Sequence, residues 1–157
     1  MKILFLSGPN LNLLGLRDQA LYGPLTLAEI VKNVRDLGLT KGCEIFDKQS
    51  NHEGFLIDWI HDAIKDKNAP FAVSVAGIII NAGGLTHTSV SLGDAIKEAR
   101  DQGIPSIEVH LSDINKREKF RRFSYLKKFC IAQISGKGPK GYTEGLLKLI
   151  KHIKAKK

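Results

Sequence analysis

The chain of 157 residues has the composition of one globular domain, with 43% hydrophobic and 25% charged residues. No apolar run approaches the roughly 20 residues of a membrane-spanning helix, which argues against an integral membrane protein of that kind. The first residues lack a secretory pattern, so we expect a cytoplasmic protein. Cys43 and Cys130 form neither a metal-ligand spacing nor a disulfide framework, and we expect both to be free thiols.

Positive charge is concentrated in the last third of the chain. Residues 110–157 hold 14 Lys and Arg against 3 Asp and Glu, a net charge of +11, whereas residues 1–109 hold 10 against 13, a net charge of −3. A basic third is typical of proteins that bind nucleic acid, but it also fits an anionic small substrate plus a solvated lysine tail at about 151–157. Few aromatic residues lie among these charges, so stacking on nucleic-acid bases has little support.

The first element in chain order is a buried strand at 3–6, and an unusually long connection follows it at about 8–24. Connections between a strand and a helix usually take about 2–6 residues. This one carries five leucines and three glycines, and it is too apolar for a free linker. We predict a lid that closes over a site at the carboxyl edge of a sheet, with glycines as hinges. An ordinary long loop packed by its leucines is the alternative.

Helical and extended segments then alternate to the end of the chain, without an internal repeat. Periodicity and capping patterns predict helices that begin near 27, 53 and 88, a charged helical segment at 112–123 and a last helix around 146–153. Runs of β-branched and apolar residues predict further strands at 43–47, 71–81, 106–110 and 129–134. This order predicts an α/β fold: one domain over 1–157, a flavodoxin-like three-layer sandwich with a five-stranded parallel doubly wound sheet.

Polar side chains gather near the ends of three predicted strands. Each has a structural explanation when taken alone, such as capping a helix or forming a hydrogen-bonded core histidine. In a doubly wound sheet, however, the three strand ends share one edge, and ligands bind at that edge. We therefore predict a functional site built from Asn10, Asn12, Arg17 and Tyr22 after the first strand, Asn81 and His87 at the third, and Glu108, His110 and Ser112 at the fourth.

Several familiar kinds of site lack their residues in this sequence. No cysteine cluster, helical histidine pair or acidic ladder indicates a metal site, and no nucleophile elbow or Walker A pattern occurs. Gly136, Gly138 and Gly141 match a dinucleotide fingerprint as a string, but only 16 residues and no further strand follow them. Close packing of the last helix on the sheet explains these glycines better. What remains is a cofactor-free set of histidine, tyrosine, arginine and amide groups, which suits proton transfer on a small oxyanion.

Five sequence blocks occur in order and cover nearly the whole chain. They are GPNLNLLG with Arg17 and Tyr22, then 49–54, 78–81 with 86–90, 107–112 with 117–121, and 138–142. At these spacings the blocks resemble those of the type II 3-dehydroquinate dehydratases. The resemblance implies a flavodoxin-like subunit in a dodecamer of four trimers, with no nucleic-acid or membrane partner. It also implies removal of water from 3-dehydroquinate to give 3-dehydroshikimate through an enol or enolate, without metal or cofactor, in the shikimate pathway or in quinate breakdown.

The resemblance also implies five catalytic residues. Tyr22 is the expected proton acceptor; because a free tyrosine ionises near pH 10, we expect the positive charge of Arg17 to stabilise its anion. Asn12 is expected to hold a water molecule against the developing enolate oxygen. His110 is the expected proton donor to the departing hydroxyl. Glu108, two residues earlier on the same strand face, is expected to orient the imidazole.

Six further residues are expected, from the resemblance, to bind the substrate: Asn81, His87, Asp94, Leu111, Ser112 and Arg121. The backbone amides of Leu111 and Ser112 should donate hydrogen bonds to the substrate carboxylate at a helix N-terminus. Asp94 is expected to reach the substrate of a neighbouring subunit, which would make the trimer the catalytic unit.

Four positions depart from the pattern of the family. Gln19 and Ala82 stand where proline is common, Asp113 stands where asparagine is usual, and Gly93 is unusual inside its helix. None of these changes removes a residue to which we assign chemistry. Two other interpretations stay open at this point: a basic flavodoxin-like module that binds nucleotides or nucleic acid without enzymatic activity, and a family member that has lost its activity.

Overall fold

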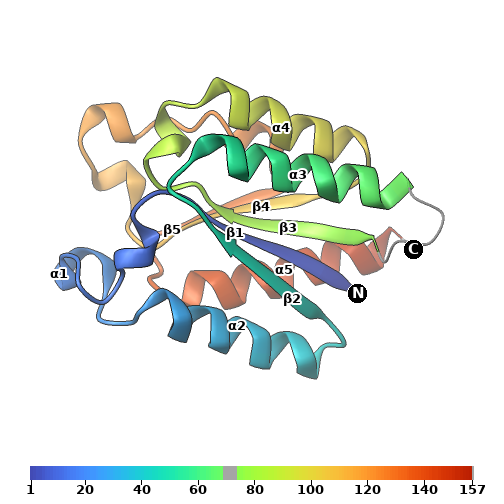
Figure 1. Ribbon diagram of the computed structural model, residues 1–157. Helices are drawn as coiled ribbons and strands as arrows, with labels where there is room; N and C mark the ends of the chain where they lie inside the picture. The colour runs from blue at the N-terminus through green and yellow to red at the C-terminus, as the bar shows by residue number, and fades with distance from the viewer. Residues whose placement is uncertain (69–73, 157) are drawn as a thin grey trace.

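The structure is a computed structural model that describes residues 1–68 and 74–156 (Figure 1). Its described residues form one sheet of five parallel strands in the order β2-β1-β3-β4-β5. This arrangement confirms the predicted flavodoxin-like α/β fold. The strands are β1 (Lys2–Ser7), β2 (Glu44–Gln49), β3 (Val75–Asn81), β4 (Ser106–His110) and β5 (Ala132–Ser135).

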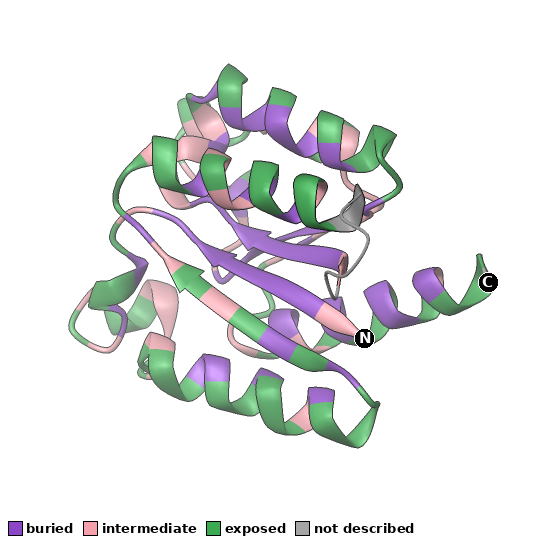
Figure 2. Cartoon of the chain, turned by 45° about the vertical axis from the view of Figure 1, so that its right-hand side comes forward, coloured by how far each residue is buried: buried purple, intermediate pink, exposed green. Residues whose placement is uncertain are grey.

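Helices cover both faces of the sheet. In Figure 1, α2 (Leu27–Thr40) and α5 (Lys140–Ala155) lie below the sheet, and α3 (Glu53–Asn68) and α4 (Val90–Asp101) lie above it. Each face buries its own apolar cluster. Figure 2 shows the inner strands almost wholly buried, whereas in the edge strand β2 exposed residues alternate with buried or half-buried ones.

Local sequence signals account for the helix starts. The Thr26 hydroxyl accepts the backbone N–H of Glu29, and the Glu29 carboxylate accepts the N–H of Thr26, so α2 begins with the predicted capping box. The Ser89 hydroxyl accepts the N–H of Leu92 at 2.8 Å and caps α4. It also donates to the carboxylate of Glu53, the first residue of α3, which ties the beginnings of the two upper helices together.

Gly93 has a packing reason inside α4. A Cβ atom at this position would lie 3.0 Å from the carbonyl oxygen of Tyr125, so a larger residue would push α4 away from the segment that contains Tyr125. Gly8 plays a similar part at the end of β1, where a side chain would collide with the backbone of Ala82. Both glycines therefore allow loops at the carboxyl edge of the sheet to approach closely.

Three predicted segments differ from the structure. The charged segment 112–123 is no α-helix; it holds only the short 3₁₀ turns η3 (Ile114–Lys116) and η4 (Lys119–Arg121), because its charges leave no continuous apolar face. Strand β5 begins three residues later than predicted, after the 3₁₀ turn η5 (Lys127–Phe129). Residues 69–73, which include the predicted start of the third strand, lie outside the described residues.

The segments near both ends of the chain contain helical structure beyond what the sequence predicts. The long connection after β1 contains two short helices, η1 (Leu11–Leu13) and α1 (Gln19–Tyr22), and its Leu11 and Leu14 are buried. At the other end, α5 continues to Ala155, so most of the basic tail at 151–157 is the last part of a helix. In the described residues, no helix combines the length and the apolar character that crossing a bilayer requires.

Candidate active site

A cavity of about 180 Å³ lies at the carboxyl edge of the sheet, where the strand ends face the connection 8–24. Figure 1 shows this edge at the left, with the connection, the loop after β3 and the loop after β4 converging on it. The cavity brings together nine of the residues singled out from the sequence. These are Asn10, Arg17, Tyr22, Asn81, His87, His110, Leu111, Ser112 and Arg121.

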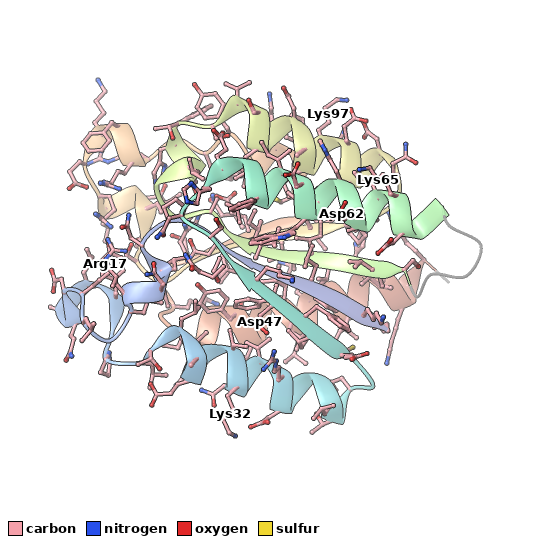
Figure 3. All side chains as sticks on the ribbon, viewed as in Figure 1. Arg17, Lys32, Asp47, Asp62, Lys65 and Lys97 are labelled. Carbon is pink, nitrogen blue, oxygen red and sulfur yellow. The ribbon has the colours of Figure 1, made fainter. Side chains whose placement is uncertain are left out.

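A short helix presents Arg17 and Tyr22 to one side of the cavity. The Asp18 carboxylate accepts the N–H of Ala20 and begins α1, and Gly23, with φ of 81°, ends it after one turn. Arg17 therefore precedes the turn and Tyr22 closes it, which places the two side chains together. Figure 3 shows Arg17 on this connection, at the end of the molecule where the strands terminate.

Two guanidinium groups surround the Tyr22 hydroxyl. Arg17 Nη2 donates to it at 3.3 Å, and the Arg17 guanidinium lies 4.3 Å from the centre of the tyrosine ring. Arg117 Nη1 donates to the same hydroxyl at 3.4 Å and to the Ser112 hydroxyl at 3.3 Å. Burial lowers the pKa of Arg117, but the hydrogen bond to Tyr22 and the charges of Tyr22 and Glu118 outweigh it, so the pKa is raised.

Arg117 is a site residue that the sequence analysis missed. It appeared there only as part of a sequence block, without a role. Its separation from Tyr22 by 95 residues gave no local sign of the contact. The available signal was an arginine shortly after the polar end of the fourth strand, within the basic third of the chain.

Glu108 and His110 form a buried pair on β4. Both side chains point to the same face of the strand, as predicted from their spacing, and His110 Nε2 lies 2.6 Å from Glu108 Oε1. Glu108 has no exposed surface, and His110 is 5% exposed. His110 lines the cavity, whereas Glu108 lies behind it as a second layer. The pair is thus held by the sheet itself and is shielded from water.

Asn81, at the end of β3, is fixed by two hydrogen bonds. Its Oδ1 accepts the N–H of Gly83 at 3.1 Å, and its Nδ2 donates to the hydroxyl of Tyr142 at 2.8 Å. Tyr142 is fully buried, and burial raises its pKa to about 12 even though the Asn81 hydrogen bond acts in the opposite direction. The phenol is therefore neutral at physiological pH. The Tyr142 hydroxyl accepts one of the two Nδ2 hydrogens of Asn81, so the other N–H of this amide can still bind a ligand.

His87 has a defined tautomer in this arrangement. Its Nδ1 lies 2.7 Å from the carbonyl oxygen of Phe123, and since a carbonyl can only accept, Nδ1 carries the hydrogen. Burial lowers the pKa of His87; the bond to Phe123 opposes this effect, and the charges of His110 and Arg121 add to it. A neutral His87 thus offers Nε2 as a hydrogen-bond acceptor at the cavity.

The expected anion site around Leu111 and Ser112 is built differently from the prediction. No long helix begins there, because η3 spans only three residues and Asp113 caps it by accepting the N–H of Asn115. The Ser135 hydroxyl instead donates to the carbonyl of Ser112 at 3.1 Å and holds the turn. Positive charge at this point comes from Arg117 rather than from a helix dipole.

Besides Glu108, two predicted residues lie outside the cavity lining. Asn12 is exposed on η1, and its Oδ1 accepts a hydrogen bond from Gln49 at 3.5 Å. Its neighbour Asn10, with φ of 66°, lines the cavity instead. Asp94 is exposed on α4. Among the described residues, no three His, Cys, Asp or Glu side chains gather in a way that could hold a metal ion.

Comparisons with known proteins agree with this geometry. Residues 1–150 match the family profile described as dehydroquinase class II. This chain belongs to the class II dehydroquinase family. A 3-dehydroquinate dehydratase from a Nostoc species is 47% identical over 154 residues, which cover 98% of this chain and 97% of that protein. One from Variovorax paradoxus is 45% identical over 149 residues, which cover 95% and 98%.

Solved structures of class II dehydroquinases share the fold. The type II dehydroquinase from Butyrivibrio crossotus has a TM-score of 0.87 and 39% identity, over 95% of this chain and 97% of that one. The type II dehydroquinase from Propionibacterium acnes has a TM-score of 0.84 and 32% identity, over 96% of each chain. Membership of the family removes support from the alternative of a nucleotide- or nucleic-acid-binding module.

Proposed function

We propose that this chain is a 3-dehydroquinate dehydratase, a hydro-lyase that converts 3-dehydroquinate to 3-dehydroshikimate. The observation that carries the proposal is the pairing of two proton-transfer groups across one cavity. A tyrosine hydroxyl beside two guanidinium groups lies on one side, and a histidine bound to a buried carboxylate lies on the other. Membership of the class II dehydroquinase family agrees with this reaction.

The reaction begins with removal of the C2 proton, next to the C3 ketone. Tyr22 in its anionic form accepts this proton, and the C–H electrons move into an enolate. The positive charges of Arg17 and Arg117, whose donors lie 3.3 and 3.4 Å from the Tyr22 hydroxyl, stabilise the tyrosinate. Closure of the connection 8–24 over the substrate brings this group to the reacting carbon.

The enolate then expels the C1 hydroxyl, and His110 protonates that hydroxyl so that it leaves as water. His110 Nε2 is engaged by Glu108, so Nδ1 is the atom that gives the proton. The buried carboxylate of Glu108 stabilises the imidazolium and fixes its orientation. Asn12 holds a water molecule against the enolate oxygen. In the present arrangement its side chain accepts a hydrogen bond from Gln49 outside the cavity, so closure of the lid has to bring Asn12 to the substrate.

The remaining polar groups bind the substrate. Leu111 and Ser112 hold the carboxylate, with Arg117 supplying positive charge beside the Ser112 hydroxyl. Asn81 offers an N–H, His87 offers Nε2 as an acceptor, and Arg121 offers N–H donors to the ring hydroxyls. A site with donors and acceptors in fixed positions can discriminate between ring hydroxyls by their direction.

We further propose a cytoplasmic enzyme that assembles as a dodecamer of four trimers and acts in the shikimate pathway. The exposed position of Asp94 on α4 supports a contact with the substrate of a neighbouring subunit. The apolar side chains of Val90 on α4 and of Phe120 and Phe123 near the cavity are exposed, which supports a neighbouring subunit covering this surface. Sedimentation of the purified protein tests the assembly, and a stable monomer with full activity would contradict it.

The first experiment is an ultraviolet assay with 3-dehydroquinate and a chelator, which follows the conjugated enone of the product. We expect enone formation by the wild-type chain and its loss in Tyr22→Phe. If well-folded, assembled wild-type protein formed no enone, the proposed function would be wrong. Binding to labelled oligonucleotides would then be measured as the competing activity.

A further inference from the structure

Ser124 contacts the buried carboxylate behind the catalytic histidine. Its hydroxyl lies 2.8 Å from Glu108 Oε1 and 2.9 Å from Oε2. The same Oε1 atom is 2.6 Å from His110 Nε2. The three side chains thus form a continuous chain from a loop residue, through the carboxylate, to the wall of the cavity.

The direction of the hydrogen bond between Ser124 and Glu108 is fixed by the backbone. The N–H groups of Leu126 and Lys127 both donate to the Ser124 oxygen, each at 3.1 Å. A hydroxyl has two lone pairs and one hydrogen, so these two bonds occupy its acceptor capacity. Its hydrogen must therefore go to Glu108, which has to act as the acceptor. A carboxylate is a stronger acceptor for such a bond than a neutral group is.

This polarity determines where the hydrogens lie on His110. With Glu108 as the acceptor of the Ser124 hydrogen, the arrangement places the hydrogen that joins Glu108 and His110 on His110 Nε2. The other ring nitrogen, Nδ1, is then the atom that exchanges a proton with the substrate. We propose that Ser124 is a positioning residue: it holds Glu108 as the acceptor for His110 Nε2–H, which orients the imidazolium so that its Nδ1 proton goes to the leaving hydroxyl. This inference rests on the proposed function of His110.

The segment that contains Ser124 is itself held in place. The N–H of Tyr125 donates to the carbonyl of Thr86 at 3.0 Å, in the 3₁₀ turn η2 (Gly83–His87) after β3. The carbonyl of Phe123 accepts the Nδ1 hydrogen of His87 at 2.7 Å. The backbone of Tyr125 also packs against Gly93 of α4. Residues 123–125 therefore define the tautomers of both histidines in the cavity, whose rings lie 6.3 Å apart.

The experiment compares two events on 3-dehydroquinate in D₂O: exchange of the C2 proton, seen by NMR, and formation of the enone. Tyr22 governs exchange, whereas His110 acts only afterwards. If Ser124 acts through His110, Ser124→Ala slows dehydration about tenfold or more, leaves KM nearly unchanged, and raises the ratio of exchange to dehydration by a similar factor. Ser124→Thr, which keeps a hydroxyl, restores most of the wild-type ratio.

A matched control is available on the same strand. Ser106 of β4 is buried, and its hydroxyl has no hydrogen-bond partner among the described residues. We expect Ser106→Ala to keep the wild-type rate and ratio. Nitrogen-15 NMR of labelled histidine gives a second readout. It should show His110 with Nε2 protonated in the wild-type and Ser106→Ala proteins, and a mixture of rings protonated at Nε2 or only at Nδ1 in Ser124→Ala.

The outcomes separate this inference from the proposed function. If His110→Asn raises the ratio but folded Ser124→Ala does not, Ser124 has no positioning role. If His110→Asn leaves the ratio unchanged, the role of His110 in protonating the leaving group is wrong, and the inference falls with it. Should Ser124→Ala fail to fold, Ser124→Cys provides the same comparison, because a thiol is a much weaker donor to the carboxylate.

Discussion

The two sides of the cavity are built in different ways. On the strand side, Glu108 and His110 are buried, and their side chains are 2.6 Å apart. On the side of the connection 8–24, the proposed lid, α1 has only four residues and none is buried, and the bonds to the Tyr22 hydroxyl are long, at 3.3 and 3.4 Å. We call this the lid side. The fold therefore holds His110, the proposed proton donor, in place before substrate arrives, whereas Tyr22, the proposed proton acceptor, depends on a short segment without buried residues.

This difference has a consequence for substitutions. Changes on the lid side should reduce turnover with little effect on stability, because few buried contacts are lost. Changes on the strand side should reduce both, because a buried group left without its partner is destabilising. The following substitutions test whether the two sides separate in this way.

The largest effect is expected at Tyr22. Tyr22→Phe removes the proposed proton acceptor and should lower kcat about 10³-fold, within the usual contribution of a general base. C2 proton exchange should fall by the same factor, and the melting temperature should stay within about 1 °C, because the side chain lies on the lid. A Tyr22→Phe protein that still exchanged the C2 proton at the wild-type rate would place the base elsewhere.

The next effect concerns the two guanidinium groups at the Tyr22 hydroxyl. Arg17→Ala and Arg117→Ala each remove one charged hydrogen bond and should lower kcat about 10- to 100-fold. If both groups stabilise one tyrosinate, the double variant should lose less than the product of the single losses. Strict additivity in this double-mutant cycle would show that the two arginines act on different groups. Arg100→Ala, on the far side of the molecule in α4, serves as the control.

A smaller effect is expected on the strand side, at Tyr142. Tyr142→Phe removes the acceptor of the Asn81 Nδ2 hydrogen at a fully buried position. The free energy of unfolding should fall by about 1–3 kcal/mol, and KM should rise a few-fold as the amide loses its orientation. Chemical denaturation and steady-state kinetics measure the two effects. If Tyr142→Phe left stability unchanged but greatly lowered kcat, the strand side would behave like the lid side, and the expected difference between them would be wrong.

The sequence predicted what is encoded locally. The strand at 106–110, the capping box at Thr26 and the alternation of strands with helices each depend on neighbouring residues, and the structure contains them. The common face of Glu108 and His110 follows from the period of a strand. The charged segment 112–123 was mistaken for a helix because its solvated charges resemble an exposed helical face, although no apolar stripe accompanies them.

Contacts between distant segments could not be predicted in this way. Arg117 meets Tyr22 across 95 residues, Tyr142 meets Asn81 across 61, and Ser124 reaches Glu108 only because the loop after β4 folds back on η2. Each of these partners supports a residue that the sequence did identify. A pattern of residue types can thus indicate which side chains gather at one site, but the groups that orient them depend on how loops pack together.

The smallest effect concerns the pH dependence of stability and comes from His87, which lies between the two sides. Its pKa in the folded chain is lowered from 6.5, chiefly by burial, so below pH 6.5 the unfolded chain binds a proton that the folded chain does not. The contribution of the neutral ring is therefore complete above pH 6.5 and is lost as the pH falls toward the lower folded value. His87→Gln should lose less stability than the wild type between pH 6.5 and 5, in denaturation curves measured at each pH. His61→Gln, at an exposed histidine on α3, is the matched control, and parallel pH curves for the wild type and His87→Gln would show that the half-buried ring of His87 contributes nothing.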